Sequence, residues 1–108
     1  MKDPLAGVSA AFRTFATEAP EHAEAWTAAV QGLSSASALD PKTARLAYLA
    51  VLAALRLDSG APFHARLARE AGATRKEVIG AVLIGLPAAG LGVTQVLPAA
   101  LAGYDAED

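Results

Sequence analysis

The hydrophobic positions in the middle of the chain form one run without a polar face. From Ala47 to Leu55 the only polar group is the hydroxyl of Tyr48. A helix that is apolar on every side is normally surrounded by other elements. Asp40 and Pro41 precede the run, and an N-cap Asp followed by a first-turn Pro is a typical helix start. The pattern predicts a central helix over about residues 41–57.

Turn residues separate this central helix from three shorter helices downstream. Asp58-Ser59-Gly60 interrupts the pattern, and either Asp58 or Ser59 can cap a second helix that ends near Gly72. Thr74 and Glu77 have the spacing of a capping box, which opens a helix over 76–86. A last helix is expected over 91–102.

Two moderately amphipathic segments, 5–15 and 20–33, precede the central helix. The serine-containing run 31–38 predicts a linker. No long stretch alternates with period two, so no strand is expected. The sequence therefore predicts one all-α domain of five or six short helices over residues 1–108. The upstream side chains expected to face its core are Phe12, Phe15, Trp26 and Val30.

Composition and charge narrow the function classes. A formal net charge of −2 gives no electrostatic reason to expect a nucleic acid or an anionic membrane as partner. The chain has no cysteine, which excludes a disulfide framework, a thiolate nucleophile and a thiolate metal site. We expect no metal and no cofactor. Residues 1–15 have no long apolar segment, which predicts a cytoplasmic protein.

Residues 78–101 carry no charge and are long enough to span a bilayer. Pro87, Pro98 and four glycines interrupt them, and Thr94 and Gln95 are polar. Two shorter helices fit this segment better than one membrane span, so we expect no membrane association. Such an apolar segment in a short chain favours burial between copies of the chain, as in a homo-oligomer.

Three segments in a fixed order carry a family resemblance. Leu39-Asp40-Pro41-Lys42 precedes the central helix, Phe63-His64-Ala65-Arg66 follows its break, and residues 71–78 form a small-residue stop before an acidic capped helix. Together they resemble the carboxymuconolactone decarboxylase and alkylhydroperoxidase D superfamily. The resemblance implies an alkylhydroperoxidase D-like helical domain and a homo-oligomer, a trimer or a hexamer.

The resemblance also shows which chemistry is missing. Redox members of the superfamily use a glutamate on the central helix, two cysteines and a histidine. The corresponding positions here are Arg45, Leu57, Gly60 and His64, so the histidine alone remains. Thiol peroxidase activity is excluded, because no thiolate can attack the peroxide. The decarboxylase branch does not use the cysteine pair, but no second histidine stands beside His64, so assigning that activity rests on fold analogy.

His64 is the candidate catalytic residue. It would serve as a proton donor or anion-binding group paired with Arg45 or Ser59. The alternative is a structural remnant bonded to a backbone carbonyl or a carboxylate. Arg45 would bind a ligand carboxylate, or form an ordinary ion pair with Asp58 or Glu70. Tyr48, on a neighbouring face of the same helix, would line the same pocket or pack in the core.

Two functional hypotheses follow from these residues. The first is a degenerate member of the superfamily that is structural or binds a small ligand. The second is a cysteine-independent enzyme, decarboxylase-like or isomerase-like, that acts on a small carboxylate with His64 as acid–base and Arg45 as carboxylate anchor. The hypotheses differ in whether the two side chains face one solvent-connected cavity.

Overall fold

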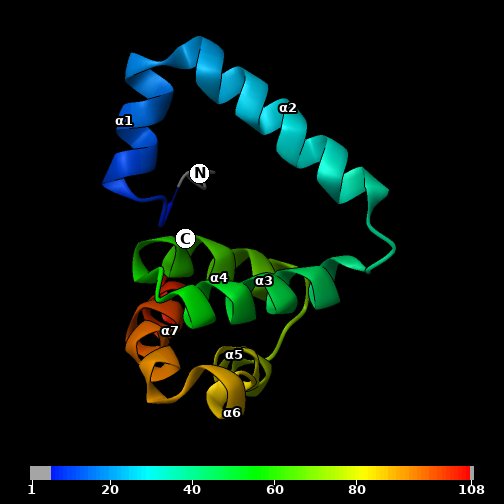
Figure 1. Cartoon of the computed structure of the whole chain (residues 1–108), viewed down its shortest axis with the longest axis vertical. Helices are drawn as coiled ribbons and strands as arrows, with labels where there is room; N and C mark the ends of the chain where they lie inside the picture. The colour runs from blue at the N-terminus through cyan, green and yellow to red at the C-terminus, as the bar shows by residue number, and fades with distance from the viewer. Residues whose placement is uncertain (1–5, 108) are drawn as a thin grey trace. The chain divides into compact units, whose positions relative to one another are not determined.

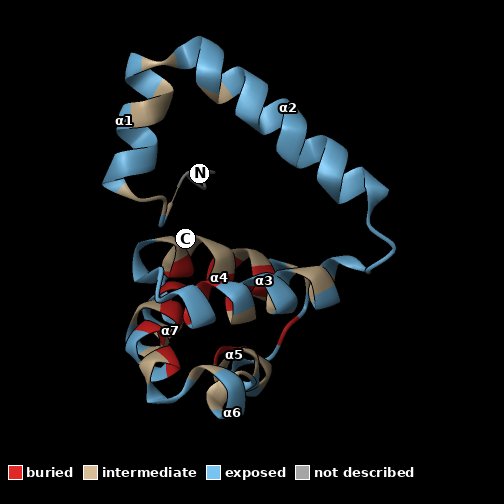
Figure 2. Ribbon diagram, in the orientation of Figure 1, coloured by how far each residue is buried: buried red, intermediate tan, exposed pale blue. Residues whose placement is uncertain are grey.

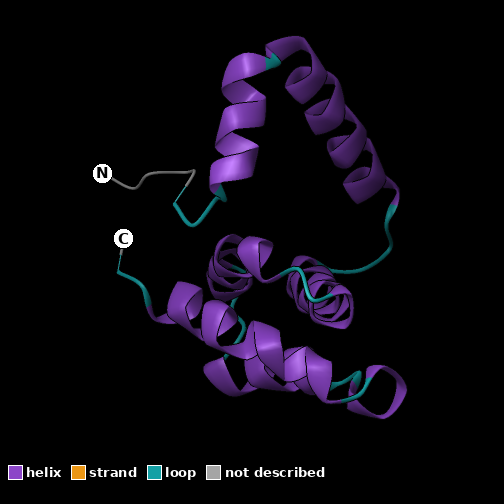
Figure 3. Cartoon of the chain, turned by 60° about the vertical axis from the view of Figure 1, so that its left-hand side comes forward, coloured by secondary structure: helices purple, strands orange, loops and turns teal. Residues whose placement is uncertain are grey.

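The structure is a computed structural model that describes residues 6–107. Within these residues the regular elements are all helical, and no strand is present (Figure 3). Six helices have nine residues or more, which confirms the predicted all-α class. The elements are α1 (Ala10–Glu18), α2 (Pro20–Ala36), α3 (Pro41–Leu55), η1 (Asp58–Gly60), α4 (Ala61–Glu70), α5 (Arg75–Leu83), α6 (Leu86–Ala89), η2 (Leu91–Val96) and α7 (Leu97–Asp105).

The chain divides into two compact units (Figure 1). The α1–α2 unit is Ser9–Leu39, and the core unit takes residues 1–8 and 40–108. Every buried residue among those described lies in the core unit, whereas α1 and α2 contain none (Figure 2). The expectation that Phe12, Trp26 and Val30 face a core is therefore wrong for the described residues, where each is more than a third exposed. The single domain over 1–108 stays a prediction.

Small side chains let the helices of the core unit pack closely. Gly103 of α7 lies against Pro62 of α4, and a β-carbon on this glycine would overlap the Pro62 backbone. Arg69 strengthens the same contact, because its Nη1 donates to the backbone oxygens of Tyr104 at 2.7 Å and Ala106 at 2.9 Å. The buried hydrophobic core consists of Leu49, Leu52, Ala53, Ala61, Ala65, Ala68, Ala73, Val78, Val82, Val93, Val96 and Ala100.

Local capping accounts for two of the predicted helix starts. The Asp40 carboxylate accepts from the Thr43 N–H at 3.3 Å and opens α3. The capping box of α5 is confirmed: the Glu77 N–H donates to the Thr74 hydroxyl at 3.1 Å, and the Thr74 N–H donates to the Glu77 carboxylate at 2.8 Å. Glu77 also binds Lys42 at 2.8 Å. One carboxylate thus caps α5 and connects it to α3.

Two boundaries in the N-terminal part of the chain differ from the sequence prediction. Residues 31–36 are helical rather than a linker, because α2 continues to Ala36 before Ser37 turns extended. Ser9 caps α1, so that helix begins later than predicted, and residue 5 lies outside the described residues. No helix in the described part of the chain combines the length and hydropathy needed to cross a bilayer.

The break before α4 differs from the prediction as well. Neither Asp58 nor Ser59 caps this helix; both belong to the short turn η1, and Gly60 occupies the N-cap position without a side-chain bond. Pro62 in the first turn has no N–H group, so one backbone donor that would need a cap is absent. The predicted helices over 76–86 and 91–102 are divided instead into α5, α6, η2 and α7.

Candidate functional site

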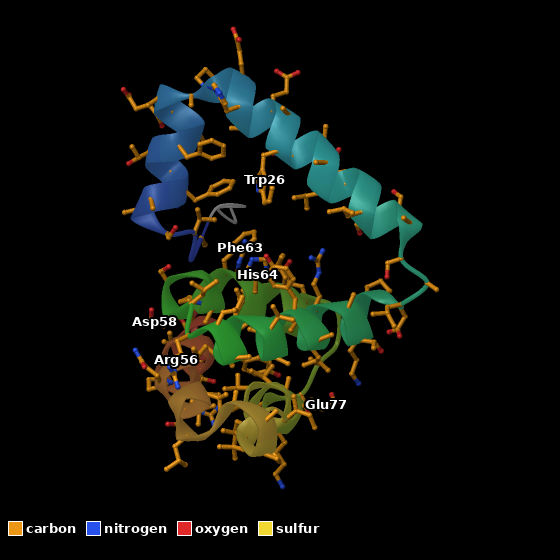
Figure 4. All side chains as sticks on the ribbon, viewed as in Figure 1. Trp26, Arg56, Asp58, Phe63, His64 and Glu77 are labelled. Atoms are coloured by element: carbon orange, nitrogen blue, oxygen red, sulfur yellow. The ribbon has the colours of Figure 1, made fainter. Side chains whose placement is uncertain are left out.

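His64 lies in the first turns of α4 and is held by two aromatic rings. The Tyr48 ring of α3 lies 4.4 Å from the imidazole, centroid to centroid, with 36° between the planes. The ring of Phe63 meets the imidazole edge-on at 5.2 Å (Figure 4). Tyr48 and His64 come from different helices, so packing of α4 against α3 creates this contact. Two of the residues selected from the sequence are therefore brought together.

The surroundings of His64 favour its neutral form. Burial lowers the pKa of His64 to about 4, and the positive charge of Arg45 contributes in the same direction. Its Nδ1 atom is buried and has no hydrogen-bond partner within the described residues. Buried polar atoms are normally bonded, so this atom is an exception. The bond to a carbonyl or carboxylate that a structural remnant would make is not made at Nδ1.

Arg45 is the nearby cation. It lies on α3 three residues before Tyr48, its side chain is exposed, and its charge reaches His64. The alternative ion pairs with Asp58 and Glu70 are not formed within the described residues, and Glu70 binds Arg66 at 3.3 Å instead. Arg45 is therefore available to an anion from solvent.

The positions that carry cysteines in redox relatives also lie at this site. The Gly60 N–H donates to the Leu57 carbonyl at 3.3 Å, which closes the turn between them. A β-carbon on Gly60 would lie 3.9 Å from Cδ2 of His64 and 3.7 Å from the Leu52 side chain. These are ordinary van der Waals distances. The backbone of the site thus leaves room for a side chain that the sequence does not supply.

Ser59 is not brought into a described contact with the imidazole. It is exposed in η1, and no hydrogen bond joins it to Nδ1 of His64. Its proposed ligand-binding role stays a prediction.

Two cavities among the described residues are lined by neither His64 nor Arg45. One of about 160 Å³ lies in the core unit against Gly7, Pro62, Arg66 and Gly103. The other, of about 450 Å³, lies within the α1–α2 unit. Arg66 lines the first of these cavities and is only 6% exposed, and the sequence analysis did not predict this burial. The available signal was its position between Ala65 and the apolar residues that follow in α4.

A metal centre has no support in the described part of the chain. No group of three or more His, Cys, Asp or Glu residues lies close enough to hold a metal ion there.

A model of the carboxymuconolactone decarboxylase family matches residues 20–102. The chain belongs to this family. No curated protein and no solved structure matches it. This member of the carboxymuconolactone decarboxylase family has no cysteine, and His64, Tyr48 and Arg45 remain its candidate site residues.

Proposed function

We propose that this chain is a degenerate member of the carboxymuconolactone decarboxylase family that binds a small carboxylate at His64 without transforming it. The observation that carries the proposal is the pairing of an exposed arginine with a partly buried imidazole that has an unbonded ring nitrogen. A carboxylate would accept charge-assisted hydrogen bonds from Arg45, which are stronger than bonds between neutral groups. A neutral imidazole would add a hydrogen bond without adding charge.

The protonation state of His64 supports binding over catalysis. With a pKa of about 4, about one imidazole in a thousand is protonated at pH 7. General acids work best with a pKa near the working pH, so His64 is a poor donor to a carbanion left by decarboxylation. No second histidine or carboxylate stacks on or bonds to His64 among the described residues.

A second candidate is a cysteine-independent enzyme, and the neutral imidazole favours one version of it. His64 would accept a proton from a carbon acid while Arg45 holds the substrate carboxylate. That arrangement supplies the base that the first step of an isomerase-like proton transfer needs. A base whose conjugate acid has a pKa of about 4 is weak, and this weakness places the enzyme second. A decarboxylase-like reaction would need a separate proton donor, and Tyr48, whose ring contacts the imidazole, carries a hydroxyl group.

The proposal includes a homo-oligomer, a trimer or a hexamer, in the cytoplasm. Its support is the exposed apolar surface of the core unit, where Ile84 is 71% exposed and Leu91 is 78% exposed. Side chains this large are expected to be covered in an assembly when they gather in patches. No partner other than a further copy and a small carboxylate is proposed.

The test is titration calorimetry with benzoate and acetate as probes, and with benzamide as the uncharged control. We expect a carboxylate to bind and benzamide not to bind. Arg45→Gln is expected to weaken carboxylate binding by tenfold or more, equivalent to about 1.4 kcal/mol. Lys76→Gln, which removes an exposed cation from α5, is the matched control and should leave the affinity unchanged. Absence of binding, or equal effects of the two variants, would refute the carboxylate site.

The enzyme candidate has its own test. The protein is incubated with a small lactone carboxylate, and carbon dioxide release and proton exchange into D₂O are followed by NMR. Exchange that is lost in His64→Gln would favour the isomerase-like enzyme. Neither product nor exchange is expected if the protein binds without reacting.

Thiol peroxidase turnover should stay absent even when thiols are restored. The double substitution Leu57→Cys and Gly60→Cys is expected to fold, because the space beside Gly60 accepts a β-carbon. Peroxide turnover should remain far below that of a redox relative, because Arg45 stands where the proton-handling glutamate would be. Full turnover in the double variant would show that this glutamate is dispensable.

A further inference from the structure

A cavity of about 160 Å³ lies in the core unit where α7 packs on α4. Small apolar side chains and glycine backbone make up most of its walls, which include Gly7, Pro62, Ala102, Gly103 and Ala106. We call it the α4–α7 cavity. An engineered apolar cavity of about 150 Å³ in another protein admits benzene. The α4–α7 cavity therefore has room for an apolar group of about that size.

One wall of the α4–α7 cavity carries a buried cation. Arg66 lines the cavity and is only 6% exposed. Its Nη1 donates to the Glu70 carboxylate at 3.3 Å, and its Cζ lies 5.4 Å from the centroid of the Phe63 ring. A guanidinium is a planar fork of N–H donors that matches the geometry of a carboxylate. Because these contacts hold the side chain in place, Arg66 would lose little conformational entropy on binding a carboxylate.

A carboxylate lines the same cavity. Glu107 follows α7, and its side chain is exposed. The backbone next to it is held to α4 by Arg69, whose Nη1 donates to the carbonyl oxygens of Tyr104 at 2.7 Å and Ala106 at 2.9 Å. The Glu107 carboxylate and the Arg66 guanidinium therefore border one small space with opposite charges.

We propose that the α4–α7 cavity binds a small apolar α-amino acid in its zwitterionic form. The ligand carboxylate accepts hydrogen bonds from Arg66, and the ligand ammonium group pairs with Glu107. The apolar side chain lies against Ala102 and Gly103. A monocarboxylate would bring a second negative charge to Glu107, and a simple amine would bring a second positive charge to Arg66. A ligand that carries both charges complements both residues.

The first test compares three ligands of nearly equal shape by NMR titration of the isotope-labelled protein at neutral pH. L-Valine carries both charges, isovalerate lacks the ammonium group, and L-valinamide lacks the carboxylate. We expect L-valine to shift the amide signals of Ala102 and Gly103. It should bind about threefold more tightly than isovalerate, because Glu107 is exposed and its ion pair is screened. It should bind about tenfold more tightly than L-valinamide, because Arg66 is buried.

Two results of this titration would overturn the proposal. One is the absence of L-valine binding. The other is an equal affinity for L-valine and either analogue, which would show that the cavity does not recognise both charges.

The second test fills the cavity with a larger side chain. Ala102→Leu places three more carbon atoms at the cavity wall, and Ala88→Leu at an exposed position of α6 is the matched control. We expect Ala102→Leu to weaken L-valine binding by about tenfold or more, and the control to bind as wild type does. Equal affinities of the two variants would overturn the site. If Ala102→Leu does not fold, the ligand series and the next variant still decide.

The third test removes the exposed charge. Glu107→Gln should weaken L-valine binding by about threefold and should strengthen isovalerate binding, because the repulsion between two carboxylates is lost. Glu21→Gln, at an exposed position of α2, is the matched control and should change neither affinity. A Glu107→Gln variant that binds both ligands as wild type does would overturn the assignment of the ammonium group.

These outcomes are separable from those of the proposed function, which the inference goes beyond. Neither His64 nor Arg45 is among the described residues that line the α4–α7 cavity. Arg45→Gln should therefore leave L-valine binding unchanged, and Ala102→Leu should leave benzoate binding unchanged. L-Valine binding without benzoate binding would support the cavity and refute the carboxylate site, and the reverse would overturn the inference alone. Benzoate binding that is lost in Ala102→Leu would overturn the choice of a zwitterion, because benzoate has no ammonium group.

Discussion

The core unit and the α1–α2 unit are both helical, but only one of them has an interior. Leu49, Val78 and Val82 are fully buried in the core unit. The longest helix of the chain, α2 with 17 residues, has no buried residue, and its Trp26 is 55% exposed. Helix formation follows from local propensity and capping, whereas lasting stability comes from a packed face. The difference implies that packing within the α1–α2 unit adds little to the stability of these two helices.

The largest expected effect on the free energy of unfolding comes from replacing a buried leucine of the core unit, and an exposed leucine of the α1–α2 unit provides the comparison. Leu49→Ala removes a fully buried side chain and should lower the free energy of unfolding by about 2–5 kcal/mol. Leu33→Ala removes a side chain that is 71% exposed and should change it by less than about 0.5 kcal/mol. Urea unfolding followed by circular dichroism measures both. A cost for Leu33→Ala close to that of Leu49→Ala would contradict the comparison and show that α2 is covered in the assembly.

Replacing one glycine of each unit by alanine should change stability in opposite directions. Gly103→Ala would force a β-carbon into the backbone of Pro62, and we expect a loss of about 1–3 kcal/mol from overpacking. Gly32, inside α2, has no neighbouring atom within 4 Å of the position its β-carbon would take. Gly32→Ala should therefore raise stability by about 0.5–1 kcal/mol, because alanine favours a helix. Thermal unfolding of the two variants should shift in opposite directions; shifts of equal sign would contradict this account.

The pH dependence of stability should reflect one histidine of the core unit. The pKa of His64 falls from 6.5 to about 4 on folding, so below pH 6.5 the unfolded chain binds a proton that the folded chain does not. The contribution of His64 to the free energy of unfolding is therefore fully present above pH 6.5. It declines as the pH falls from 6.5 towards 4 and does not change further below pH 4. The slope is at most one proton. His64→Gln should remove this part of the profile, measured by urea unfolding at fixed pH values. An unchanged profile would show that His64 is not the group responsible.

The sequence predicted the parts of the fold that depend on neighbouring residues. Asp40 with Pro41 and the Thr74–Glu77 capping box act within one turn of helix, and both are observed. The prediction of a linker over 31–36 was wrong because serines are tolerated in a helix that alanine, glutamine and leucine already favour. The prediction that Asp58 or Ser59 caps α4 was wrong because both residues belong to η1, which precedes α4 in the chain.

The candidate site likewise has features that the sequence predicts and features that it does not. The family resemblance predicted His64 and Arg45 as site residues, and helical spacing predicted that Tyr48 lies beside Arg45. The stacking of Tyr48 on His64 and the unbonded Nδ1 arise from the packing of α4 on α3, which no local pattern encodes. The arrangement of Arg56 against Gly92 joins residues 36 positions apart, and sequence spacing gives no signal for it.

The most direct test of the account is an NMR titration of the His64 imidazole in wild type and Arg45→Gln, with and without benzoate. The account predicts a pKa near 4 in the free wild type, a higher pKa in Arg45→Gln because a nearby positive charge is removed, and a higher pKa when a carboxylate is bound. A wild-type pKa near the ordinary 6.5 that neither Arg45→Gln nor benzoate changes would contradict it.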